Sequence, residues 1–225
     1  MKRRSLWPIP AVLVAIPMLQ AGCGGLLAPK PDLTRYYLLA SLSEMGQRGG
    51  PEPSEPSTAV PISVGLGPIR LPGYLDRERI VVRASANRLE LLDLSRWAEP
   101  LEQSLYRVIA ENLAGLLGTN DIRLFPFSGP APEVKLQIDI RRFETSEDYS
   151  ATLAACWFVK DGRSDEVLAC RETRVTKPAR DRSISGSVGA LSEALGELSV
   201  QMASAVRTIR QPGPAAAAGS APGVR

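Results

Sequence analysis

The sequence predicts an α+β fold, a two-layer arrangement in which two main helices pack on one mixed, largely antiparallel sheet. Short segments with strand-like composition come first, a helical segment follows, three strand segments come next, and a long helical segment ends the series. Hydrophobic residues make up 44% of the 225 residues, which is enough for a core without metal or disulfide support. We therefore place one domain at residues 34–210.

The first part of this domain is predicted to form short strands. Four runs are rich in apolar, β-branched or aromatic residues: 34–39, 62–66, 80–83 and 88–91. Residues 45–59 are rich in Gly, Pro, Ser and Glu, so we expect a mobile loop there. Ala86-Asn87 stands between the last two runs and predicts that they pair as a hairpin.

The first helix is predicted at residues 99–117, because apolar residues recur there at intervals of three and four. Pro100 suits the first helical turn, where its missing N–H costs no hydrogen bond. Gly118 suits the left-handed conformation that commonly ends a helix.

Three strands are then predicted to form an antiparallel meander. Residues 134–141 alternate between apolar and polar side chains, which is typical of a half-buried strand. Residues 149–160 and 166–176 form the other two strands, joined by a turn at 161–165.

The last helix has one apolar seam with steps of three and four residues. Its members are Val188, Leu191, Leu195, Leu198, Met202, Ala205 and Ile209. This seam either packs on the sheet or pairs with another helix. Ser185 or Ser187 is the expected N-cap, and residues 211–225 are expected to be a disordered tail.

Residues 1–22 resemble a bacterial secretory signal peptide. Basic residues 2–4 precede an uncharged, mostly apolar stretch, whose prolines suit a membrane-spanning helix poorly. The stretch ends in Ala21-Gly22-Cys23, which is similar to the lipobox in which the cysteine is acylated, although Gln20 stands where a lipobox usually has Leu. The alternative is ordinary cleavage near Ala21, which leaves Cys23 as a spare thiol.

Acylation of Cys23 predicts a periplasmic protein held to a membrane by two or three acyl chains, which anchor stably where one is marginal. Residues 23–33 are then a lipidated tether. Gly24 rather than Asp follows the cysteine, which resembles cargo that enteric-type sorting sends to the outer membrane.

The absence of histidine excludes Ser-His-Asp and Cys-His catalysis and the common His-containing zinc sites. Without residues 1–22, the chain has 24 basic and 24 acidic side chains, so we expect no nucleic-acid partner. We also expect no cofactor, no metal and no catalytic residue.

Two further features have plain structural interpretations. Gly65-Leu66-Gly67 begins like a dinucleotide fingerprint but lacks its third glycine, so a bulge or close packing of the backbone is expected. Glu144, Glu147 and Asp148 form an acidic cluster that we interpret as solvated surface.

Cys156 and Cys170 are predicted to form a disulfide, because exported proteins meet an oxidising compartment. Seven residues separate each cysteine from Arg163. A hairpin centred there would place the two cysteines directly opposite each other, and in a non-hydrogen-bonded pair their Cα atoms would be about 4.5 Å apart, at the short end of disulfide geometry. Two buried thiols are the alternative.

Two aromatic residues are candidate partner contacts. Trp97 lies just before the first helix and either packs at its start or anchors a partner. Tyr74, in the loop at residues 71–76, is equally consistent with packing or contact.

Several motifs occur in a characteristic order: Cys23 with its lipobox-like end, then residues 35–39 (RYYLL), 71–76 (LPGYLD), 80–83 (IVVR) and 97–101 (WAEPL), the last leading into a helix with Asn112-Leu113. Together they resemble the ABC-type transport auxiliary lipoproteins, the family of paraquat-inducible protein C, over residues 19–209. The resemblance implies a non-enzymatic α/β domain that can form a ring-like homo-oligomer. Its implied partners are MCE-domain proteins and an ABC-type or integral membrane complex, which it would dock at the outer membrane.

Three function hypotheses follow. The first is a lipid-anchored adaptor of an MCE-type intermembrane lipid transport system. The second is a periplasmic carrier that binds lipid or another hydrophobic ligand in its own cavity. The third, a hydrolase, is disfavoured because the sequence has neither histidine nor a Ser-x-x-Lys motif.

Overall fold

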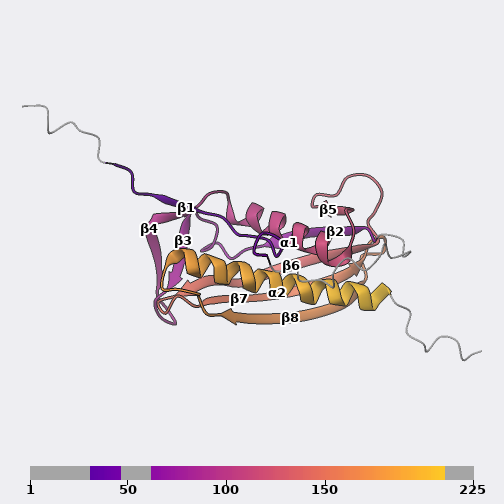
Figure 1. Ribbon diagram of the computed structural model, residues 1–225. Helices are drawn as coiled ribbons and strands as arrows, with labels where there is room; N and C mark the ends of the chain where they lie inside the picture. Colours follow the sequence, from indigo (N-terminus) through magenta and orange to yellow (C-terminus); the bar gives the residue numbers. More distant parts are fainter. Residues whose placement is uncertain (1–30, 47–61, 211–225) are drawn as a thin grey trace, which may run out of the picture. The chain divides into compact units, whose positions relative to one another are not determined.

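The computed structural model describes residues 31–46 and 62–210 (Figure 1). The predicted signal peptide, Cys23, most of the predicted loop at 45–59 and the predicted tail lie outside the described residues. The elements below all belong to one compact unit that begins at Thr34.

The described residues form one eight-stranded mixed sheet. Its strands are β1 (Arg35–Tyr37), β2 (Val64–Arg70), β3 (Arg79–Arg83), β4 (Leu89–Trp97), β5 (Ile122–Leu124), β6 (Val134–Ser146), β7 (Ala151–Asp161) and β8 (Val167–Lys177). They follow the order β1-β4-β3-β6-β2-β5, and β7 and β8 extend the sheet from the other edge of β6. β1 and β5 therefore end this path.

The meander β6-β7-β8 is antiparallel along its length, as predicted. Leu136 and Ile138 of β6 are fully buried, while Gln137 and Asp139, which follow them in turn, are half-buried, and this confirms the alternation. The hairpin of β3 and β4 is also confirmed. β4 continues further than predicted, because its last three residues pair in parallel with β1.

Two helices cover the sheet: α1 (Leu101–Leu117) packs near β2 and β5, and α2 (Ile184–Arg210) packs on β6, β7 and β8 (Figure 1). Gly118 ends α1 in the left-handed conformation, with φ of 65°. The apolar seam of α2 is buried from Val188 to Ala205, so it packs within the molecule. The α+β prediction is confirmed.

The N-cap prediction for α2 is wrong, because the cap lies two residues before the first predicted serine. The hydroxyl of Ser183 accepts a hydrogen bond from the Gly186 N–H at 2.9 Å, so Ser183 caps the helix. Ser185 and Ser187 lie inside it. The Ser187 hydroxyl instead donates to backbone carbonyls of Ser183 and Tyr149.

A strap at residues 39–42 connects β1 to both helices. Leu39 and Leu42 are buried, and the Leu42 N–H donates to the Asn112 side chain of α1 at 2.8 Å. Asn112 in turn donates to the Ser199 hydroxyl of α2 at 3.2 Å. A Cβ at Gly196 would lie 2.6 Å from the end of the Leu42 side chain, so the strap packs closely on α2 there.

Candidate functional site: a groove between α1 and β5

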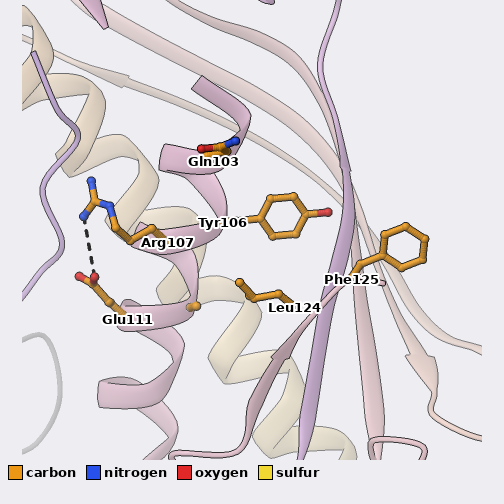
Figure 2. A pocket seen from close by; sticks show the side chains of 7 residues that line it. Gln103, Tyr106, Arg107, Glu111, Leu124 and Phe125 are labelled. Atoms are coloured by element: carbon orange, nitrogen blue, oxygen red, sulfur yellow. Dashed lines mark ion pairs between the residues drawn. The ribbon is translucent and has the colours of Figure 1, made fainter. Parts of the chain in front are cut away.

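An open groove of about 440 Å³ lies between the outer face of α1 and the end of β5 (Figure 2). Five residues of α1, the last residue of β5 and the residue after it line the groove: Gln103, Tyr106, Arg107, Ala110, Glu111, Leu124 and Phe125. The sequence singled out none of them. The available signal was an aromatic residue on α1 outside the leucine face, together with the apolar run at residues 122–127.

Tyr106 fixes α1 against the sheet at the floor of this groove. Its hydroxyl accepts a hydrogen bond from the Ile69 N–H at 3.0 Å. A Cβ at Gly67 would lie 2.5 Å from that hydroxyl, and Gly67 has φ of 114°, which disfavours other residues. The register of β2 against β6 also shifts between Leu66 and Ile69. The prediction of bulge and close-packing glycines is therefore confirmed.

Burial raises the pKa of Tyr106 above its ordinary value of 10.0, so the phenol is neutral at physiological pH. Because the neutral Tyr106 hydroxyl accepts the bond from the Ile69 N–H, its role is to position α1 on the sheet. Its ring presents an apolar surface to the groove (Figure 2).

Leu124 and Phe125 form the apolar wall of the groove. Their exposed fractions are 46% and 49%, which is high for side chains of this size. Phe125 meets Phe127 edge to face, with ring centroids 5.7 Å apart. This contact holds the wall in place on the outer strand β5.

One residue of each charge lines the groove, Arg107 and Glu111. Arg107 forms ion pairs with Glu99 at 3.1 Å and with Glu111 at 3.8 Å. Its guanidinium also donates to the Leu39 carbonyl at 3.0 Å, so the cation is shared between the rim and the strap. The two charged lining residues therefore balance each other, which favours a ligand held mainly by apolar contact.

A second polar cluster lies at the C-terminal part of β6. Glu144 is only 2% exposed and accepts hydrogen bonds from Arg83, from Arg142 at 2.9 Å and from the Tyr74 hydroxyl at 2.6 Å. The interpretation of Glu144 as solvated surface is wrong. Glu147 of the same predicted cluster is 61% exposed.

The electrostatics of this second cluster favour a charged Glu144. Burial alone would raise the pKa of Glu144, but the bonds from Arg83, Tyr74 and Arg142 outweigh it and hold the pKa below 4.5. Burial and the neighbouring carboxylate raise the pKa of Tyr74 to about 12. Tyr74 is half-buried, and its hydroxyl fastens the loop at 71–76 to β6 through the bond to Glu144.

Trp97 lies in the core. It is 6% exposed, and its backbone pairs with Tyr37 of β1. This burial favours packing at the start of α1 over contact with a partner.

The predicted register of the two cysteines is wrong. Cys156 lies opposite Glu172, and Cys170 lies opposite Phe158, so the cysteines are diagonal neighbours on one face. Diagonal Cα atoms are about 7–8 Å apart, beyond the usual range for a disulfide. Both thiols are free in the structure. Burial and the Cys170 thiol raise the pKa of Cys156, which lowers its thiolate fraction.

No group of acidic or cysteine side chains among the described residues could hold a metal ion. Neither of the two described helices is long and apolar enough to cross a membrane.

A family model for the ABC-type transport auxiliary lipoprotein component matches residues 41–203, well over half of the chain. The chain belongs to this family. The family match covers the second half of the strap, all of the sheet from β2 onward, α1 with its groove and most of α2.

Two solved structures are similar to this auxiliary lipoprotein. Protein XCC0632 from Xanthomonas campestris has a TM-score of 0.63 and 19% identity, over 78% of this chain and 96% of that one. An uncharacterized protein has a TM-score of 0.62 and 15% identity, over 77% and 98%. At these identities the likeness shows the fold. No curated protein matched the sequence.

Proposed function

We propose that this auxiliary lipoprotein is a lipid-anchored periplasmic adaptor of an MCE-type intermembrane lipid transport system, and that it docks the assembly at the outer membrane. Family membership carries the proposal. The signal-like start of the sequence and Cys23 support the anchor. The adaptor acts by binding rather than by chemistry, and assembly of several copies belongs to the same proposal.

The groove between α1 and β5 supports an adaptor, because it is a preformed contact surface on a packed domain. Its wall exposes Leu124 and Phe125, while the Tyr106 hydroxyl fixes the floor rigidly. Apolar anchors that insert into such surfaces dominate the energy of many interfaces. We propose that an apolar segment of the MCE-domain partner occupies the groove.

Copurification from cross-linked membranes tests this function. We expect mass spectrometry to identify an MCE-domain protein or an ABC-type membrane subunit with the wild-type protein. Leu124→Glu should reduce that yield by about tenfold, since it adds a charge to an apolar wall. Leu168→Glu is the matched control, because Leu168 is 41% exposed on β8, away from the groove.

Three results would each contradict one part of this proposal: the groove, the adaptor role or the anchor. An equal fall in the yield of copurified partner with both variants would show that the groove is not the contact surface. Copurification of bound lipid without any transport protein would favour the carrier instead, since a groove of this volume is within the range of ligand pockets. A Cys23→Ser protein that still carries labelled palmitate would remove the anchor at that residue.

A further inference from the structure

Strand β1 has large apolar side chains on both faces, but the described residues cover only one of them. Tyr37 packs against the core, and Leu39, two residues after it, is 1% exposed. Tyr36 and Leu38 point the other way and are 62% and 52% exposed. A continuous apolar run of this kind is typical of a strand that is buried on both faces.

Strand β4 extends the uncovered surface. Tyr36 pairs in parallel with Arg96, and Leu94 lies two residues earlier on β4. Leu94 is 52% exposed. We call Tyr36, Leu38 and Leu94 the β1–β4 face.

The face itself is formed by uncharged side chains, and two ion pairs lie beside it. Arg96 pairs with Glu78 at 3.1 Å, and Arg79 pairs with Asp93 at 3.0 Å. These two ion pairs leave little net charge, so an occupant of the face would be held by apolar contact rather than by electrostatic attraction.

We propose that the β1–β4 face rests on the lipid surface that holds the acyl chains of Cys23. This inference rests on the lipid anchor of the proposed function. Arg35, the first residue of β1, follows Cys23 by twelve residues, and twelve residues span at most about 40 Å when fully extended. The anchor therefore keeps this face at a high effective concentration near the membrane, where weak apolar contact suffices.

The contact would orient the domain. β1 and β5 are the two ends of the main strand path, and they lie apart in Figure 1. With β1 at the lipid surface, the groove beside β5 remains available to a partner.

Quenching of tryptophan fluorescence by brominated phospholipid tests the inference. The full acylated protein is reconstituted into phosphatidylethanolamine–phosphatidylglycerol vesicles with and without brominated lipid. The variants Tyr36→Trp and Leu94→Trp probe the face, and Leu124→Trp in the groove is the control at similar exposure. The buried Trp97 and Trp157 also fluoresce, and the wild-type protein gives the size of this background signal.

We expect the tryptophans at positions 36 and 94 to be quenched at least about twofold more than the tryptophan at 124, because interfacial apolar groups enter the boundary of the acyl region. Raising the salt concentration should leave this difference unchanged, since the face carries little net charge. Agreement of the two face variants makes local misfolding an insufficient explanation.

Equal quenching at all three positions in acylated protein would overturn the contact and leave the anchor intact. Blue-shifted emission at position 36 without quenching would show that protein covers the face, for example a second copy, and would also overturn it. The intact mass of the reconstituted protein reports acylation separately. An unmodified Cys23 would overturn the anchor and, with it, both proposals.

Discussion

Replacing Glu144 by glutamine removes the charge of the buried carboxylate and keeps its shape. Arg83 and Arg142, which pair with it, are then left without their counter-charge. Removing one partner of a buried ion pair costs about 3–5 kcal/mol of folding free energy.

The expected cost for Glu144→Gln is smaller than that range. The side chains of Arg83 and Arg142 keep exposed fractions of 22% and 32%, so water partly solvates them after the change. The glutamine oxygen can still accept the bond from the Tyr74 hydroxyl. We therefore expect a loss of about 2–3 kcal/mol, which corresponds to about 5–10 °C in Tm for a domain of this size.

Urea or thermal unfolding of the two proteins measures this loss, with Glu147→Gln as the matched control. Glu147→Gln makes the same change in charge three residues away. Because the Glu147 side chain is 61% exposed, this substitution should change the free energy of unfolding by less than about 0.5 kcal/mol. Equal effects of the two substitutions would refute the conclusion that the Glu144 cluster supports the fold.

Three more predictions follow from the structure. Folding holds the pKa of Glu144 below 4.5, so its contribution to the free energy of unfolding is complete above that pH and is lost as the pH falls through the folded-state pKa. The difference in stability between wild type and Glu144→Gln should therefore narrow below about pH 4.5. Acid titrations followed by circular dichroism measure this difference. Gly67→Ala should cost about 1–3 kcal/mol in chemical unfolding, because its Cβ would meet a tyrosine hydroxyl at a positive φ, whereas Gly115→Ala in open space on α1 should stabilise by about 0.5–1 kcal/mol; similar effects of the two would contradict the close packing at Gly67. Non-reducing peptide mapping should find Cys156 and Cys170 as free thiols, and a peptide that joins them would show that the register is different.

The elements that the sequence predicted well are those whose signal is local. The seam of α2 repeats over many turns, and the alternation of β6 is regular, so each pattern identifies one element and its buried face. Gly118 marked the end of α1 for the same reason, since a left-handed residue is a local requirement.

The Glu144 cluster could not be predicted, because its partners are distant in the chain. Tyr74 and Arg83 stand 70 and 61 residues before Glu144. In the sequence Glu144 resembles Glu147, and only the pairing of β3 with the end of β6 separates them. The groove has the same origin: its two walls meet because β5 pairs with β2, which places Leu124 beside Leu66.

The cysteine register shows how two small departures from a simple hairpin act together. Direct opposition of Cys156 and Cys170 needs Lys160 opposite residue 166, but the turn places Lys160 opposite Val167, one residue later. A bulge then adds a second residue, Leu168, before Val159 pairs with Ala169. One shift alone would have put the cysteines on opposite faces of the sheet. Two shifts return them to the same face, but as diagonal neighbours, so the predicted proximity survives while the predicted bond geometry does not.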